Sequence, residues 1–144
     1  MKPIGQHTAR KMQHHILVVE DEPHVGLFVE VLLASRGYKV SLCVDSVDAL
    51  SRFAARPWQF DLVLTDQNMP QMCGVELAKA MRAIRADIPI ILCSGLGLED
   101  LRASMTDNEV SSCISKPLQT AELLKVIADK LMYRHDRGDC AAGG

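Results

Sequence analysis

The sequence predicts a single α/β domain with a doubly wound, five-stranded parallel sheet and helices on both faces. Five short apolar runs alternate with segments whose apolar residues recur at helical spacing, a pattern typical of parallel sheets with crossover helices. The run Leu62–Thr65 shows no polar alternation, as expected of a central strand that is covered on both faces. The chain has 144 residues, which suits one domain with a sizeable core.

Composition excludes several classes of function. Hydrophobic residues make up 48% of the chain and charged residues 24%, as in soluble globular proteins, and the formal charge of −2 gives no general attraction to nucleic acid or to anionic membranes. The apolar runs are too short to span a bilayer, and the first 15 residues lack the apolar stretch of a signal peptide. Five cysteines form no C-x-x-C pair, which favours a reducing cytoplasm over a disulfide framework or a zinc site.

The first strand–helix unit follows a flexible lead-in, which we expect to cover residues 1–13. The first strand begins near His14 and contains the apolar run Ile16–Val19. Pro23 suits the first turn of the helix that follows, and Gly37 is placed to end it. The residues predicted to face the sheet from this helix are Val25, Phe28, Val29, Leu32 and Leu33.

A second unit starts with the strand Tyr38–Val44. Either Asp45 or Ser46 can cap the next helix, which Pro57 ends, and its apolar positions are Val47, Leu50, Phe53 and Ala54. The central strand comes third and stops at Asp66. A helix from about residue 74 to residue 86 follows, and its predicted buried residues are Val75, Leu77, Ala78, Met81 and Ile84.

The last two units are shorter. The fourth strand is Ile88–Cys93, a weakly amphipathic helix spans about 98–106, and the fifth strand spans 110–115. Leu118 and Leu123 are spaced as a hydrophobic staple at the start of the last helix. We therefore assign residues 14–133 to the domain and 134–144 to a disordered tail. This division leaves no room for an output or DNA-binding domain.

Four polar residue types end the strands of the predicted sheet. Glu20 and Asp21 follow the first strand, Asp66 ends the third, and Ser94 and Lys116 follow the fourth and fifth. Singly, each is ambiguous, because an acid can simply cap a loop and an acidic run can be a solvated turn. Since the carboxyl ends of parallel strands meet at one edge, we expect these side chains to surround one pocket.

Together these residue types predict a phosphoryl-transfer site. Asp21 and Asp66 can hold Mg²⁺, which prefers a few carboxylates and several waters. A carboxylate oxygen of Asp66 can act as nucleophile and form an acyl phosphate, while the Lys116 ammonium offsets charge and the Ser94 hydroxyl donates to a phosphoryl oxygen. The sequence Gly95-Leu96-Gly97 lacks the third glycine of a dinucleotide-binding loop and does not predict one.

Four segments, ILVVEDEP, LVLTDQNMP, ILCSG and SKPL, occur in an order and spacing that resembles the receiver domain of two-component response regulators. The resemblance covers roughly residues 16–132. It implies a flavodoxin-like sheet with strand order 2-1-3-4-5, Mg²⁺ as cofactor, and a phosphohistidine on a sensor histidine kinase or a phosphotransfer protein as donor. It also implies a signalling protein in the cytoplasm, not an enzyme acting on other substrates. Parts of the sequence look like receivers attached to hybrid histidine kinases.

Carried over by position, the resemblance implies a role for each residue at the strand ends. Asp66 would be the phosphoacceptor, Asp21 a direct metal ligand, and Glu20 a ligand through a metal-bound water. Asn68 would give its backbone carbonyl to the metal, and Ser94 and Lys116 would bind the phosphoryl group. Asn68 and Leu96 border the expected approach of water, so we predict that they modulate hydrolysis of the acyl phosphate.

One position departs from the family pattern. Cys113 stands three residues before Lys116, where the family has a switch aromatic. We therefore expect a muted rearrangement of the surface formed by residues 98–106, 110–115 and the last helix. Output would go through protein–protein contact, from a monomer or from a weak dimer formed by that surface.

Two other functions use similar residues. An aspartyl-phosphate hydrolase also needs a strand-end Asp, a hydroxyl, a Lys and Mg²⁺, but it requires a second acid two residues after the nucleophile, where this chain has Asn68. A receiver that only docks, without phosphorylation, would not need the complete set of acids, hydroxyl and lysine.

Overall fold

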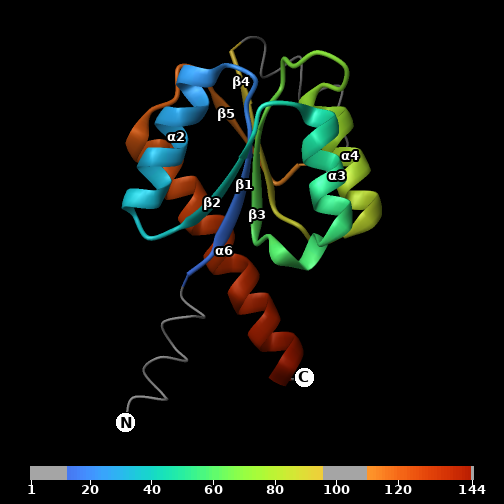
Figure 1. Cartoon of the computed structure of the whole chain (residues 1–144). Helices are drawn as coiled ribbons and strands as arrows, with labels where there is room; N and C mark the ends of the chain where they lie inside the picture. Colours follow the sequence, from blue (N-terminus) through green and yellow to red (C-terminus); the bar gives the residue numbers. More distant parts are fainter. Residues whose placement is uncertain (1–12, 96–109, 144) are drawn as a thin grey trace.

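The computed structural model describes residues 13–95 and 110–143, with side chains up to residue 132, and it contains a five-stranded parallel sheet (Figure 1). The strand order is β2-β1-β3-β4-β5, which confirms the predicted fold class and order. The strands are β1 (His15–Val19), β2 (Lys39–Cys43), β3 (Leu62–Asp66), β4 (Ile90–Ser94) and β5 (Ser112–Ser115).

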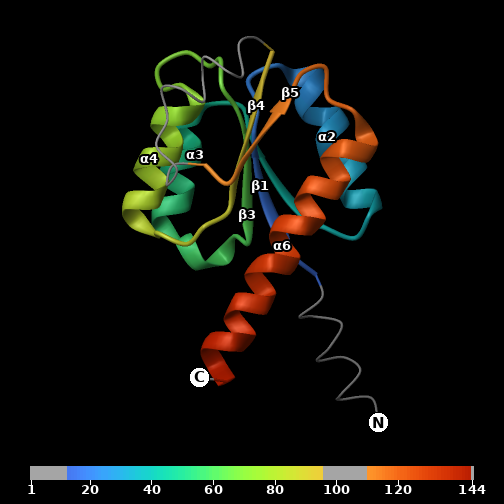
Figure 2. The same cartoon turned by 180° about the vertical axis from the view of Figure 1, so that it is seen from behind.

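Helices cover both faces of the sheet, as predicted. In Figures 1 and 2, α2 (Pro23–Ser35) and α6 (Thr120–Gly143) lie on one face, and α3 (Ser46–Ala55) and α4 (Gly74–Ile84) lie on the other. A short 3-10 helix, η1 (Pro57–Gln59), links α3 to β3. The helix predicted at 98–106 lies outside the described residues.

Alternate residues of β1, β3 and β4 enter two separate cores. In β1, Leu17 and Val19 belong to the core under α3 and α4, whereas Ile16 and Val18 belong to the core under α2 and α6. Both sides of β1, β3 and β4 are therefore buried, which explains why their sequences are continuously apolar.

Two of the predicted helix ends have clear causes. Gly37 adopts φ +91°, where an L side chain is disfavoured, and the N–H groups of Gly37 and Tyr38 donate to the carbonyls of Ala34 and Leu33 at the end of α2. At the start of α3 the cap is Asp45, whose carboxylate accepts from the N–H groups of the second and third residues after it.

Several apolar residues predicted to face the sheet are instead exposed. Phe28 is 47% exposed, Val47 49% and Ile84 43%, and Ala54 is exposed as well. The buried faces of these helices include small residues, such as Gly26 in α2 and Ser46 and Ala49 in α3. Small residues let these helices approach the sheet closely: a Cβ atom on Gly26 would lie 3.1 Å from a Leu42 methyl. A pattern of large apolar residues does not reveal this.

The C-terminal segment also differs from the expectation. We predicted a disordered tail from residue 134, but α6 continues as a helix to Gly143 and projects beyond the end of the sheet (Figures 1 and 2). The division into lead-in, domain and tail otherwise stays a prediction. No helix within the described ranges is both long enough and apolar enough to cross a membrane.

Candidate phosphoryl-transfer site

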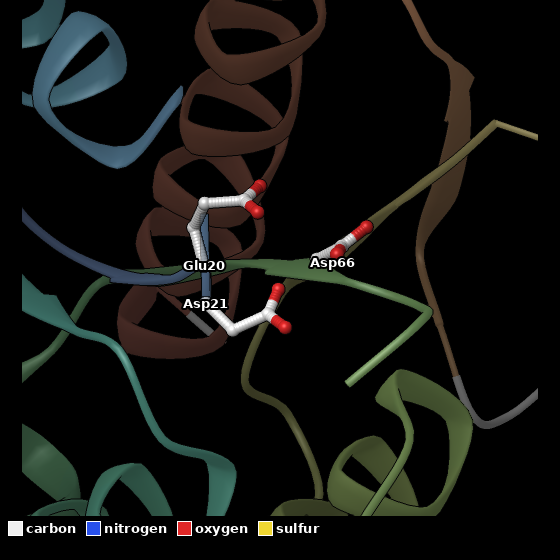
Figure 3. A group of neighbouring side chains, drawn as sticks. All are labelled: Glu20, Asp21 and Asp66. Atoms are coloured by element: carbon white, nitrogen blue, oxygen red, sulfur yellow. The ribbon is translucent and has the colours of Figure 1, made fainter. Parts of the chain in front are cut away.

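Three carboxylates converge at the carboxyl edge of the sheet. Glu20 and Asp21 directly follow β1, and Asp66 is the last residue of β3, the neighbouring strand. Each side chain offers one carboxylate oxygen, and these oxygens lie within 4.8 Å of one another (Figure 3). The structure thus brings together all three acids that the sequence predicts at this site.

Burial makes this cluster electrostatically costly. Glu20 and Asp66 are only 4% and 5% exposed, whereas Asp21 is half-buried. The backbone of Glu20 is held inside because its N–H donates to the Cys43 carbonyl (2.9 Å) beyond the end of β1. Desolvation, and then the charge of Asp66, raise the pKa of Glu20 above its ordinary value.

Lys116 brings a positive charge into the cluster from the loop after β5. Its ammonium nitrogen lies 3.1 Å from Asp66 Oδ1 and donates to Glu20 Oε1 at 3.2 Å. Burial lowers the pKa of Lys116, but the bonds to Asp66 and Glu20 outweigh burial and raise it overall. One ammonium thus pairs with two of three clustered carboxylates, and the site keeps an excess of negative charge.

The structure describes three of the four remaining predicted residues. Ser94 ends β4, is 2% exposed and pairs with Ser115, one residue before Lys116. Asn68 is exposed in the loop after β3. Cys113 is half-buried in β5 beside Leu92 of β4. Leu96 lies outside the described residues.

Gln67 is a part of the site that the sequence analysis missed. Its backbone N–H donates to Asp66 Oδ1 (2.9 Å), and its side-chain oxygen accepts from the backbone N–H of Val75 (2.9 Å). A glutamine in a polar loop carries no sequence signal of this role. The buried Gly74 was a weaker hint, since a glycine can mark a close approach of two backbone segments.

The donor set fits a divalent cation. Mg²⁺ binds oxygen ligands and is usually held by one or two carboxylates together with water. This cluster supplies three convergent carboxylates, and its negative charge exceeds what Lys116 offsets. A divalent ion would relieve the repulsion from Asp66, which adds to the effect of burial in raising the pKa of Glu20.

Comparison with known proteins gives a consistent result. The family model described as "Response regulator receiver domain" matches residues 16–128. Hybrid signal transduction histidine kinase D of Dictyostelium discoideum is 35% identical over 83% of the chain and 8% of its own length. The chemotaxis protein CheY of Treponema pallidum is 30% identical over 90% of both chains. The chain spans half or less of other curated relatives, such as the regulatory protein VanRB of Enterococcus faecalis.

Solved structures agree with these matches. The receiver domain of sensor histidine kinase PA1611 from Pseudomonas aeruginosa, described with a magnesium ion coordinated in its active site cleft, has a TM-score of 0.73 and 29% sequence identity. The match covers 83% of this chain and 98% of that domain.

Proposed function

We propose that this chain, which belongs to the family of response regulator receiver domains, takes a phosphoryl group onto Asp66. The family is one of phosphoacceptor domains in two-component signalling, so the proposal concerns which residues carry out the reaction. The observation that carries it is the position of Asp66. It ends the central strand, is 5% exposed, and has its carboxylate held by Lys116 beside two further acids.

The donor in this proposal is a phosphohistidine on a histidine kinase or a phosphotransfer protein. A carboxylate oxygen of Asp66 attacks phosphorus, the phosphorus–nitrogen bond breaks, and its electron pair returns to the imidazole ring, which takes up a proton. The relatives support this class of donor, because they include hybrid and sensor histidine kinases as well as response regulators.

Mg²⁺ is the proposed cofactor. Asp21, Asp66 and the backbone carbonyl of Asn68 would hold it directly, and Glu20 would do so through a water. When bound, the ion neutralises charge on the acids and on the transferred group. The convergent carboxylates support this proposal, as does the magnesium ion described in the PA1611 receiver domain.

Lys116 and Ser94 are the proposed phosphoryl-binding residues. Lys116 already lies 3.1 Å from Asp66, so its ammonium can pair with an oxygen of a group bound there. The buried position of Ser94 at the same strand edge supports a hydroxyl donor on the other side. We expect both residues to affect the response to phosphorylation more than the phosphorylation itself.

Output is proposed to go through protein–protein contact. Cys113 stands at the switch position of β5 and cannot provide an aromatic ring there, so we expect a muted rearrangement around β5 and α6. A weak dimer through this surface, a location in the cytoplasm and the absence of activity toward other substrates belong to the same proposal. So does modulation of hydrolysis by Asn68 and Leu96.

Intact-mass measurement tests the proposed function. The protein is incubated with acetyl phosphate and Mg²⁺, and we expect one added phosphoryl group that is absent when a chelator replaces the ion. A purely docking domain would gain no mass under any condition. An aspartyl-phosphate hydrolase would instead release phosphate from phosphomonoesters over many turnovers.

A further inference from the structure

Gln67 lies in the loop after β3 and accepts hydrogen bonds from backbone N–H groups at the N-terminal end of α4. The first N–H groups of a helix have no carbonyl partner within the helix. Here the N–H of Gly74 donates to the backbone oxygen of Gln67 (3.0 Å), and the N–H of Val75 donates to its side-chain oxygen (2.9 Å). One residue in the loop after β3 thus supplies two acceptors to the start of α4.

The same residue also contacts the carboxylate of Asp66. The Gln67 N–H donates to Asp66 Oδ1 at 2.9 Å and to the Cys93 carbonyl at 2.8 Å. Asp66 Oδ1 lies 3.1 Å from the ammonium of Lys116 as well. Because both donors bind the same oxygen, they set the rotation of the carboxylate plane.

No space separates the helix end from the reacting residue. A Cβ atom on Gly74 would lie 2.5 Å from the Asp66 carbonyl oxygen and 3.0 Å from the Gln67 Cα atom. The start of α4 therefore lies directly against the backbone of Asp66 and Gln67. A shift of this helix end would be transmitted to the backbone that carries the carboxylate.

We propose that Gln67 is a positioning residue for the reaction at Asp66, through its side-chain bond to the first turn of α4. The bond fixes the Gln67 backbone, and the fixed N–H orients the Asp66 carboxylate for attack on the phosphodonor. This inference rests on the proposed function, because it concerns the same phosphorylation. Small errors in the placement of a reacting group cost large factors in rate.

A matched control lies in the same helix end. The Glu76 side chain also caps α4, since its Oε1 accepts from the backbone N–H of Cys73 (3.0 Å), and this bond lowers the pKa of Glu76. That bond stabilises the same turn but involves neither Asp66 nor Gln67. Loss of the Glu76 cap therefore reports what helix stability alone contributes.

The test compares Gln67→Met, Gln67→Glu and Glu76→Ala at saturating Mg²⁺ and acetyl phosphate. Gln67→Met keeps the length of the side chain but removes its oxygen, and we expect the maximal phosphorylation rate to fall about tenfold. Gln67→Glu keeps an acceptor at a helix N-terminus and should restore the rate to within about threefold of wild type. Glu76→Ala should lower the melting temperature without slowing the reaction.

Equal rates in Gln67→Met and wild type would overturn the proposal, as would an equal slowing in Glu76→Ala. Amide resonances provide a readout that does not depend on phosphorylation. The Ser94 N–H signal reports the contact, because the Cys93 carbonyl of the same peptide unit accepts from the Gln67 N–H. It should shift in Gln67→Met and stay in place in Glu76→Ala, and the opposite pattern would also overturn the proposal. If wild type gains no phosphoryl group while these shifts occur as expected, the proposed function fails and the positioning contact stands.

Discussion

Each end of the sheet holds a cation, half-buried Lys116 at one end and buried Arg85 at the other, and the groups around the two charges differ. At the carboxyl end, the ammonium of Lys116 pairs with two of three clustered carboxylates. At the opposite end, the side chain of Arg85 is 1% exposed. It donates to the carbonyls of Pro57 (2.8 Å) and Phe60 (2.6 Å), pairs with Asp87 (2.9 Å), and lies 4.3 Å from the centre of the Trp58 ring.

The difference shows which end is built for stability. Neutral carbonyls, one half-exposed acid and an aromatic face surround Arg85 and offset its charge. The acids at the carboxyl end repel one another, and their charge is balanced only in part. Such an excess of like charge in a buried site is a cost in stability that suits a site completed by a cation and a phosphoryl group.

The largest expected effect is the loss of phosphorylation when Asp66 is replaced. Asp66→Asn should reduce phosphorylation by acetyl phosphate below detection, because the amide is not a nucleophile. The variant should nevertheless be at least as stable as wild type without Mg²⁺, since one of the repelling charges is gone. Intact mass and urea unfolding measure the two effects. Labelling of Asp66→Asn at the wild-type rate would disprove the assignment.

At the opposite end of the sheet, replacing Arg85 should lower stability and leave phosphorylation unchanged. Arg85→Met removes the donors to two buried carbonyls, and we expect a loss of about 3 kcal/mol in the free energy of unfolding. The acetyl phosphate reaction should be unchanged under conditions where the variant is folded. As a control, Arg52→Met removes a surface ion pair with Asp48 (3.5 Å) and should cost about 0.5 kcal/mol or less. Similar losses in both variants would contradict the structural role of Arg85.

Mg²⁺ should stabilise the protein through the carboxyl end. At a concentration about 100 times its dissociation constant, the ion should add about 2.7 kcal/mol to the free energy of unfolding. Asp21→Asn should greatly reduce this gain, because it removes a proposed direct ligand. Thermal unfolding with and without Mg²⁺ measures the effect, and an unchanged gain in Asp21→Asn would argue against its role as a ligand.

The smallest expected effect is the response to pH, whose sign differs between the two ends. Burial raises the pKa of Glu20, so its contribution to stability is present below its unfolded value and is lost as pH rises through the folded value. Burial, followed by the charge of Lys39, lowers the pKa of His15 at the start of β1, so its contribution is present above 6.5 and is lost as pH falls through the folded value.

Replacing each titrating group separates the two effects. His15→Gln keeps a polar group near Ser41 Oγ, 2.7 Å from the imidazole, and should flatten the fall in stability as the pH drops below about 6.5. Glu20→Gln should leave that fall intact and instead raise the stability of the metal-free protein near neutral pH. Chemical denaturation across this range measures both. An unaltered pH profile in His15→Gln would show that His15 does not titrate as the structure indicates.

The sequence determined the alternation of strands and helices and the residues at the strand ends. Buried parallel strands must be apolar along their whole length, so their ends are visible where the first acid, hydroxyl or lysine follows them. This is why the sequence alone places Asp66, Glu20 and Lys116 at one edge of the sheet. The end of α2 at Gly37 could be predicted for a similar local reason, because the φ of +91° there disfavours an L side chain.

The tertiary structure decided what depends on contacts between distant segments. It selected Gly26, Ser46 and Ala49 as buried residues where larger apolar neighbours are exposed, because the packing of each helix is set by the whole fold. It also joined Gln67 to Val75 and Asp66, a contact that no local preference of glutamine predicts. Sequence patterns report what each segment prefers by itself, whereas these contacts exist only once the segments are packed together.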